Sequence, residues 1–534
     1  MENVPISFSY SSCWVVTYVA TTCLAVILLT STHLIASLIL FASNFLIPIY
    51  ISFRIPKKSM QVSLPPGPAP WPVVGNLPEV FRNKPTFKWI LGLMDDMNTG
   101  IACICLGQVH VIPVTRLEIG RQFLKKQDAV FASRPITMRM EYSSRGFLSI
   151  AITPMGEQWK KMSKVVASKV ITHARLRWLL NKRMEEANNL VWFVYKLCNT
   201  SVDSIINLRV FSWQYSGNVM RKMISNKRFF GEGSKDRGPS VEEEEYVDAL
   251  FTILSLLYTF CVSDYMLSST LTFIYICIYQ GDNVNVVIGL DLCIVIYSFL
   301  YCKLLFWPYM KPMASYWLRA VITLTLLQDL IYASVDNPLN AVEWVLVEMI
   351  NRPEILKKAV EEIDWVVGRE RLVQESDFPE LNYIKACARE AFRIHPIAPF
   401  NLPHVSNYDA MVLSYFIPKG SHVLLSRVGL GRNPNIWEEP LKFKPERHLK
   451  DELANVELAE QELLFITFST RKRGCIGEEL RFAMTIMLLA STSLCSFDDI
   501  SDQIMMVGPL SWLFFFLERL SLLNDVVLVK EFDI

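Results

Sequence analysis

A cysteine late in the sequence has neighbours that favour ionisation of its thiol. Cys475 lies in the segment Phe468–Gly477, two residues after Arg473, and the pattern of Glu478–Leu489 predicts a helix directly behind it. A helix N-terminus and a nearby cation both lower the pKa of a thiol, and a thiolate is a strong metal ligand. A lone cysteine is more often a small buried hydrophobe. The neighbouring motifs must therefore decide between a metal ligand and a packing residue.

Two charged motifs precede the cysteine segment. Glu390 and Arg393 are three residues apart, which places both side chains on one face of a predicted helix. Arg447 follows in the motif Pro445–His448. Taken alone, the first motif is an ordinary surface ion pair. The order and spacing of all three motifs are harder to reach by chance.

Together these motifs resemble those of the cytochrome P450 monooxygenases. The resemblance implies that Cys475 is the axial ligand of haem iron, because a thiolate in that position pushes electron density into the iron and favours O–O cleavage. It implies that Glu390, Arg393 and Arg447 lock the haem-side core as a structural cluster. The residues it implies for contact with haem are Trp159, His404, Phe468, Arg473, Cys475 and Gly477.

Within this superfamily the chain is similar to the plant amino-acid N-monooxygenases, which form aldoximes. The residues that carry the similarity are Val335–Pro338, Asn340–Trp344, His395–Asn401 and Phe443–His448. Most P450 enzymes have a threonine where this chain has Asn337. The similarity implies a mainly α fold with small β-sheets behind an N-terminal transmembrane anchor.

The same similarity implies a reaction. A partner NADPH–cytochrome P450 reductase supplies electrons, an L-amino acid is N-hydroxylated twice, and dehydration and decarboxylation give the aldoxime used for glucosinolates, cyanogenic glucosides or defence oximes. Asp336 and Asn337 are the implied catalytic residues that, with Cys475, serve proton delivery to dioxygen. The alternative for Asp336 and Asn337 is a helix cap before Pro338.

The substrate must be a zwitterion held in an apolar pocket. Its carboxylate requires a cation and hydrogen-bond donors, and Arg134 and Asn401 are the candidates. Residues 134–142 and 146–152 are most similar to the phenylalanine-using branch. A phenylalanine-like or large aliphatic amino acid is therefore expected.

Composition narrows the class of protein. The net charge of +1 gives no reason to expect nucleic-acid binding, and the hydrophobic share of 51% indicates membrane-embedded segments. The 12 cysteines include no CxxC motif and no regular spacing, so the sequence predicts neither a zinc site nor a disulfide framework. These cysteines suit a reducing, cytosol-facing domain.

The chain divides into four predicted parts. Residues 1–53 form a membrane anchor, since 14–53 contain no charged residue, and 54–72 form a basic and proline-rich hinge. The basic residues after the anchor predict a single-pass protein of the endoplasmic reticulum membrane, in contact with lipid and with a cytosolic catalytic domain. A buried hairpin is the alternative for 14–53. Residues 73–490 form the haem domain, and 491–534 an atypical tail.

Several features depart from the family pattern. Arg471 replaces a glycine of the cysteine segment, and Ser163 replaces an arginine expected to hold a haem propionate. Segment 266–330 and the tail match nothing expected, so they are either a membrane-associated insertion or the product of a splice or frame error. The alternatives to an active enzyme are a catalytically impaired protein of the same lineage and an unrelated multi-span membrane protein.

Overall fold

The computed structural model describes residues 63–72, 74–137, 140–141, 144–200, 208–225, 264–265, 314–449, 456 and 463–494. The predicted anchor, residues 54–62 of the predicted hinge, most of segment 266–330 and all but the start of the tail lie outside the described residues. The helices that are described include none with the length and apolar character needed to span a bilayer.

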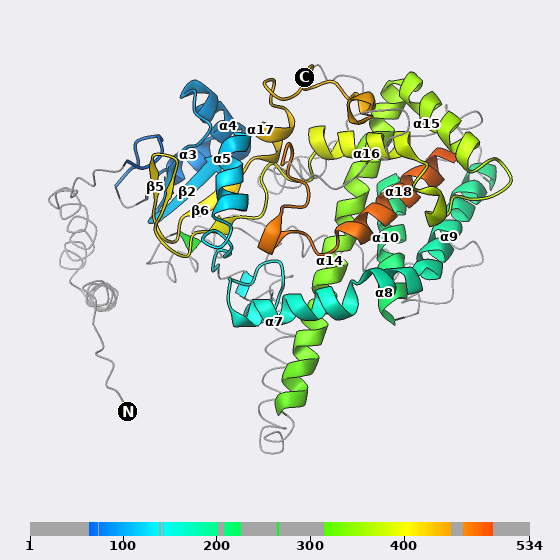
Figure 1. Ribbon diagram of the computed structural model, residues 1–534, viewed down its shortest axis with the longest axis horizontal. Helices are drawn as coiled ribbons and strands as arrows, with labels where there is room; N and C mark the ends of the chain where they lie inside the picture. Colours follow the sequence, from blue (N-terminus) through cyan, green and yellow to red (C-terminus); the bar gives the residue numbers. More distant parts are fainter. Residues whose placement is uncertain are drawn as a thin grey trace, which may run out of the picture.

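Two small sheets lie at one side of the molecule and a larger helical part at the other (Figure 1). The four-stranded sheet has the order β1-β2-β6-β3, and the second sheet pairs β4 with β5. The strands β2 and β6 are parallel, whereas the other neighbours are antiparallel. The strand bounds are β1 Ile104–Leu106, β2 Val109–Val114, β3 His404–Val405, β4 Ala410–Val412, β5 Tyr415–Ile417 and β6 His422–Leu425.

Helices make up most of the described structure. The α-helices are α3 Leu77–Arg82, α4 Thr86–Asp96, α5 Leu117–Arg121, α7 Glu157–Val165, α8 His173–Trp178, α9 Leu180–Thr200, α10 Leu208–Ser225, α14 Ala314–Asn351, α15 Pro353–Val366, α16 Asn382–Ile394, α17 Arg427–Gly431 and α18 Glu478–Leu494. Short π-helical turns occupy Gln122–Lys126 and Val166–Val170, and 3-10 turns occupy Glu375–Asp377, Pro445–His448 and Arg471–Arg473. This mainly helical architecture with two small sheets confirms the predicted fold class.

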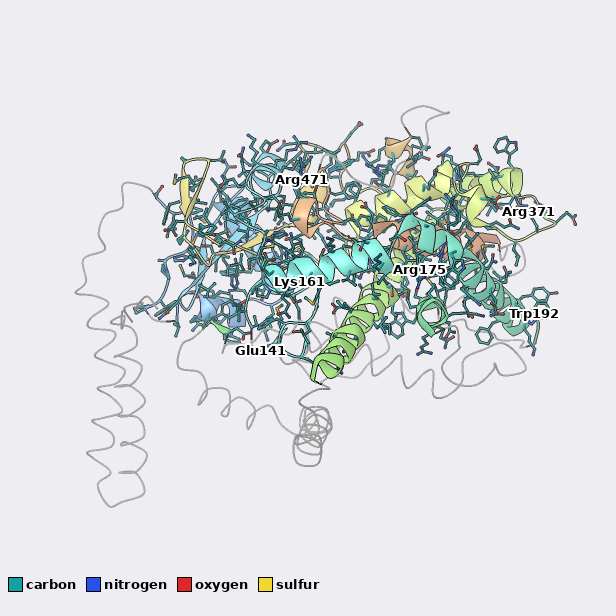
Figure 2. The ribbon with its side chains drawn as sticks, turned by 60° about the horizontal axis from the view of Figure 1, so that its bottom comes forward. Glu141, Lys161, Arg175, Trp192, Arg371 and Arg471 are labelled. Atoms are coloured by element: carbon teal, nitrogen blue, oxygen red, sulfur yellow. The ribbon has the colours of Figure 1, made fainter. Side chains whose placement is uncertain are left out.

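The main hydrophobic core joins the helices that surround the cysteine segment. It is built from α9, α10, α14, α15, α16 and α18 and includes Phe468. Nearly every side chain of α16 is buried, including Glu390 and Arg393. Charged side chains on α7 and α8, such as Lys161 and Arg175, are exposed instead (Figure 2). The sheets have separate cores on their two faces.

The long helix α14 crosses the molecule beside α18 and α16 (Figure 1). It continues through Pro338 to Asn351, so the alternative of a helix cap before Pro338 is wrong. A proline inside a helix removes one main-chain hydrogen bond. Side chains next to it bond to the main chain of the preceding turn, since Asn337 Nδ2 donates to Ala333 O over 2.8 Å and Ser334 Oγ to Leu330 O over 2.6 Å. Burial of Pro338 and Leu339 in the core offsets the lost bond.

Candidate active site

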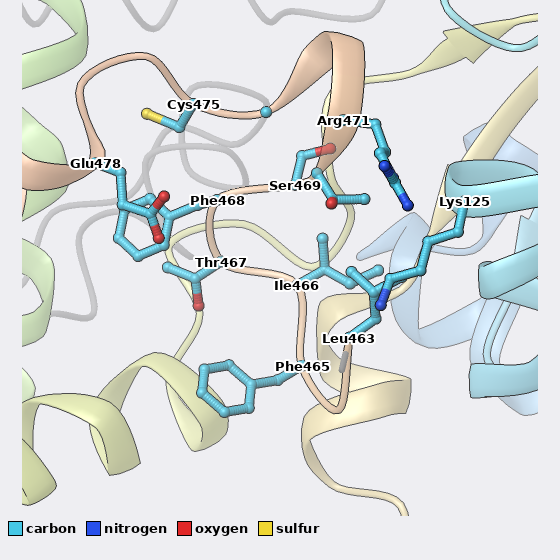
Figure 3. Close-up of a pocket in the computed structure, with 12 residues that line it drawn as sticks. Lys125, Leu463, Phe465, Ile466, Thr467, Phe468, Ser469, Arg471, Cys475 and Glu478 are labelled. Carbon is cyan, nitrogen blue, oxygen red and sulfur yellow. The ribbon is translucent and has the colours of Figure 1, made fainter. Parts of the chain in front are cut away.

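Cys475 closes a tight turn in front of α18. Its main-chain N–H donates to Phe468 O over 2.8 Å, and Gly474 N–H donates to Arg471 O over 3.0 Å. The side chain borders a cavity of about 420 Å³ whose lining also includes Glu478 and Lys125 (Figure 3). The Cys475 side chain is exposed at this cavity, with many protein atoms around it. Burial therefore raises the pKa of the Cys475 thiol, while the Gly477 N–H and the charge of Arg481 oppose that rise.

The turn before Cys475 contains strained backbone. Arg471 has φ +54° and Ser469 has φ +56°, in the left-handed region that favours glycine. A side chain in that region costs about 1–2 kcal/mol. The side chain of Arg471 points toward Lys125, away from Cys475 Sγ (Figure 3). The replacement of glycine by Arg471 thus strains the turn without occupying the space next to the sulfur.

Arg473 is buried beneath this turn. Its Nε donates to Ala132 O over 2.6 Å and its Nη2 donates to Thr153 O over 2.8 Å. The guanidinium lies 4.3 Å from the centre of the Trp159 ring, and Trp159 Nε1 donates to Ile150 O over 3.2 Å. Burial lowers the pKa of Arg473 to about 10, against the opposing charge of Asp128. Arg473 is thus a buried cation whose short hydrogen bonds go to neutral carbonyls.

Arg134 and His404 lie next to Arg473. His404 Nδ1 is 2.8 Å from Phe131 O, and its buried Nε2 has no hydrogen-bond partner in the part of the chain that the structure describes. Burial, together with the charges of Arg134 and Arg473, lowers the pKa of His404 to about 3, against the hydrogen bond with Phe131 O. The Arg134 guanidinium donates hydrogen bonds to the main-chain carbonyls of Ala151, Leu402 and Pro403. These contacts favour a place for Arg134 in this cation cluster, defined as Arg134, Arg473, Trp159 and His404, over direct contact with substrate.

The charged residues Glu390, Arg393 and Arg447 meet on the other side of the cysteine turn, at α16. Arg393 forms a bidentate pair with Glu390, at 2.8 Å from Nε to Oε2 and 2.7 Å from Nη2 to Oε1. Arg447 Nε donates to Glu390 Oε1 over 2.9 Å, and His448 Nε2 lies 2.8 Å from Oε2. Burial alone would raise the pKa of Glu390, but the hydrogen bonds from Arg393 and His448 lower it to about 2. We call these four residues the Glu390 cluster.

Comparison with known proteins identifies the family. A family model described as Cytochrome P450 matches residues 65–277 and 322–497. The chain belongs to the cytochrome P450 family. It is 48% identical to a tryptophan N-monooxygenase of Prunus mume, over 80% of this chain and 83% of the relative, and 49% identical to a phenylalanine N-monooxygenase of Arabidopsis thaliana, over 80% and 84%. A zebra fish cytochrome P450 solved with progesterone shares the fold, with a TM-score of 0.59, 19% identity and coverage of 77% of this chain and 92% of that structure.

Members of the cytochrome P450 family hold haem through a cysteine thiolate, and the residues here fit that group. Cys475 is open to the cavity, and Gly477 lies beside its sulfur, where an added Cβ would make only an ordinary van der Waals contact at 4.0 Å. Haem also carries two carboxylates. The cation cluster offers two buried guanidinium groups and the unpartnered Nε2 of His404. Guanidinium groups form strong charge-assisted hydrogen bonds with carboxylates, so this set suits a haem carboxylate.

The structure describes three other residues from the sequence analysis to different extents, namely Asp336, Ser163 and Asn401. Asp336 lies within α14, but its side chain is outside the described residues. Ser163 is one turn after Trp159 on α7 and half-buried, while Lys164 points out to solvent and cannot replace the missing arginine. Asn401 is buried and locked to β6, because its Oδ1 accepts from Leu425 N–H over 2.9 Å. Its Nδ2 has no hydrogen-bond partner among the described residues.

Two residues of the P450 site were missed in the sequence. Asp128 accepts a hydrogen bond from the Lys472 N–H and faces the positive charges of Arg471 and Arg473, so it anchors the turn before Cys475. Arg481 lies on α18 with its guanidinium 4.9 Å from the centre of the Phe468 ring. The position of Arg481 one turn after Gly477 was a usable signal. Nothing local to Asp128 indicates its distant partner.

Proposed function

We propose that this cytochrome P450 is a haem-thiolate monooxygenase that N-hydroxylates an L-amino acid and forms its aldoxime. Identity of 48–49% to tryptophan and phenylalanine N-monooxygenases over 80% of the chain carries this proposal. Both of these relatives are named for an aromatic amino acid, which favours a phenylalanine-like substrate. A large aliphatic amino acid is the next class to test.

Each site residue has a role in this proposal. Bound haem, held by Cys475, supplies the activation of dioxygen. The cation cluster binds the haem carboxylates, and the Glu390 cluster holds the main chain on the other side of the cysteine turn. Asn337, oriented by its bond to Ala333 O, serves with Asp336 in proton delivery. The free Nδ2 of Asn401 is the donor for the substrate carboxylate.

The proposed partners follow from the same function. Electrons come from NADPH through a cytochrome P450 reductase. The uncharged run at 14–53 anchors the chain in the endoplasmic reticulum membrane with the haem domain in the cytosol. Membrane binding that resists carbonate extraction and is lost on deletion of 1–53 is the expected result. Full extraction of the intact chain by carbonate would contradict the anchor.

A carbon monoxide difference spectrum of the reduced protein in microsomes tests the proposal directly. We expect the Soret band of thiolate-ligated haem, and its loss in Cys475→Ala. Incubation with NADPH, reductase and L-phenylalanine or L-tryptophan should then yield the aldoxime, measured by mass spectrometry. Absence of the band while the protein is present on a blot would sink the enzyme assignment for this chain.

A catalytically impaired protein of the same family is the second candidate. The strained φ of Arg471 and the serine at 163 favour it. Restoration separates the two candidates, because Arg471→Gly with Ser163→Arg should raise haem content severalfold only if these residues limit haem binding. Equal haem content before and after the two changes would exclude them as the cause of any impairment.

A further inference from the structure

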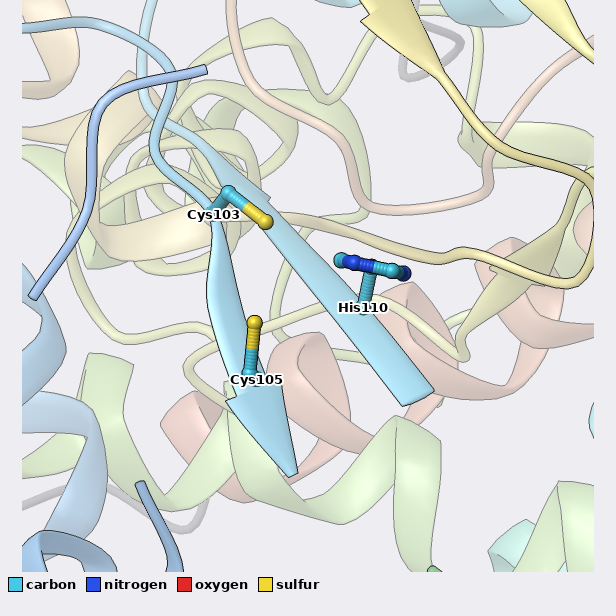
Figure 4. A group of neighbouring side chains, drawn as sticks. All are labelled: Cys103, Cys105 and His110. Atoms are coloured by element: carbon cyan, nitrogen blue, oxygen red, sulfur yellow. The ribbon is translucent and has the colours of Figure 1, made fainter. Parts of the chain in front are cut away.

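A group of metal-ligand side chains lies on the β1–β2 hairpin, away from the residues discussed so far. The sulfur atoms of Cys103 and Cys105 and an imidazole nitrogen of His110 all lie within 4.8 Å of one another (Figure 4). None of the three lines the cavity beside Cys475. The proposed monooxygenase reaction has no use for them.

The pairing of the hairpin brings these residues together. Cys105 pairs directly with His110, and paired residues present their side chains on the same face of a sheet. Cys103 lies two residues before Cys105, so it shares that face. The turn contains Gly107, whose φ of +55° strains any other residue and so holds the pairing in place. A slip of one residue would move His110 to the opposite face.

Neighbouring backbone fixes the hairpin firmly. Cys105 N–H donates to Asn76 Oδ1 over 3.0 Å, and Cys103 N–H donates to Pro66 O over 2.8 Å. Gly67 packs so closely that an added Cβ would lie 1.8 Å from Cys103 O. The backbone that carries the three ligand side chains is therefore ordered before any ion binds. This preorganisation reduces the conformational entropy that is lost on binding.

The chemistry of the three groups selects a class of ion. Thiolates and imidazole suit thiophilic cations such as Zn²⁺, whereas Mg²⁺ and Ca²⁺ require oxygen ligands. A hydrogen bond with Cys105 raises the pKa of the Cys103 thiol, and burial raises it further. Burial lowers the pKa of His110 and keeps its imidazole in the neutral form that ligates metals. Two thiolates also balance the charge of one divalent cation.

We propose that Cys103, Cys105 and His110 form a binding site for one thiophilic divalent cation, with Zn²⁺ as its natural class. Binding transfers two protons from the thiols to solvent, and the imidazole contributes its lone pair. Around tetrahedral zinc the sulfur atoms lie about 3.8 Å apart, and the ligand atoms already lie within 4.8 Å of one another, so they need to close by at most about 1 Å. Small rotations of three short side chains achieve this. Three protein ligands leave a fourth position for water.

Equilibrium dialysis of the full-length, tag-free protein against buffered Zn²⁺ tests the site, with bound metal measured by mass spectrometry. The variant Cys105→Ser with His110→Gln changes the two half-buried ligands and leaves buried Cys103 in place. His173→Gln, an exposed histidine on α8, is the matched control. We expect the double variant to bind one zinc fewer per chain than wild type, and each single change to weaken binding at least tenfold. The control should match wild type.

A second readout follows the thiols themselves. Zinc should slow the reaction of Cys105 with iodoacetamide at least tenfold in wild type but not in His110→Gln, and Mg²⁺ should have no effect. Equal zinc content in wild type and the double variant would overturn the proposal and leave a pair of hydrogen-bonded thiols with no metal role. Circular dichroism of each variant establishes that it is folded. Because neither readout needs haem, the outcome is independent of the monooxygenase proposal.

Discussion

The two buried charge clusters beside the cysteine turn are built on opposite plans. In the Glu390 cluster a carboxylate accepts hydrogen bonds from two arginines, a histidine and the Lys444 N–H. In the cation cluster two arginines donate to main-chain carbonyls, and the Nε2 of His404 has no hydrogen-bond partner among the described residues. The pKa values follow, because hydrogen bonds lower that of Glu390 to about 2 and burial lowers that of Arg473 to about 10.

This difference in charge balance indicates different roles for the two clusters, one structural and one in ligand binding. The Glu390 cluster contains both signs of charge and is complete within the chain. The cation cluster has an excess of positive charge in a buried place, which an anionic ligand would neutralise. The first cluster is therefore expected to stabilise the fold, whereas the second fits the proposed binding of a haem carboxylate.

Removal of the carboxylate in Glu390→Gln should have the largest effect. It leaves Arg393 and Arg447 buried without a counter-charge, which costs about 3–5 kcal/mol of unfolding free energy. Guanidinium unfolding of the purified protein measures the loss. Glu479→Gln is the matched control, since Glu479 pairs with His173 at 2.6 Å on the surface and exposed pairs contribute about 0–1 kcal/mol. A similar loss of unfolding free energy in Glu390→Gln and Glu479→Gln would contradict a structural role for the Glu390 cluster.

Acid titration of the haem-free protein should show the next largest effect. The folded pKa of His404, about 3, lies below its usual 6.5, so the unfolded chain takes up a proton first and stability falls as pH drops from 6.5 toward 3. Uptake of one proton by the unfolded chain alone lowers the free energy of unfolding by about 1.4 kcal/mol per pH unit. In His404→Gln the free energy of unfolding should therefore fall less steeply between pH 6.5 and 5, by up to about 1.4 kcal/mol per pH unit. His395 and His422 also have lowered pKa values, but they contribute equally in wild type and in His404→Gln. The difference between the two proteins in the slope of stability against pH therefore reports on His404.

The two clusters should also lose their contributions to stability in different pH ranges. Glu390 has a folded pKa of about 2, below its usual 4.5, so its contribution is complete above pH 4.5 and is lost as pH falls toward 2. His404→Gln should therefore leave the stability loss below pH 4.5 unchanged. A change there instead of between pH 6.5 and 5 would contradict the assignment.

The smallest expected effect concerns the strained turn. Arg471→Gly relieves the left-handed strain but adds freedom to the unfolded chain, for a net gain of about 0.5–1 kcal/mol in unfolding free energy. Lys472→Gly is the control, because Lys472 lies in the same turn without a positive φ and should lose about 0.5–1 kcal/mol. Thermal unfolding distinguishes the opposite signs. Destabilisation by both changes would show that Arg471 is not strained.

The sequence was informative where the contacts are local or the spacing is specific. The three-residue separation of Glu390 and Arg393 was enough to predict one helix face, and the cysteine motif was enough to predict the family. It failed where partners are distant, as with Arg473 and Ala132, which meet only after the whole chain folds. At Pro338 the sequence left a helix cap open as an alternative, and the structure excludes it because core packing overrides a local helix breaker. The proposed site of Cys103, Cys105 and His110 has no CxxC spacing, because a hairpin pairing and not a sequence motif brings the three side chains together.

The parallel pairing of β2 with β6 has a consequence for synthesis of the protein. Val111 pairs with His422, so the two strands are separated by most of the catalytic domain. At about 5–20 residues per second, a ribosome needs on the order of 15–60 s to produce β6 after β2. During that interval one edge of β2 offers unpaired N–H and C=O groups to any other extended chain. The nascent polypeptide therefore carries an aggregation-prone edge that only its last third can cover.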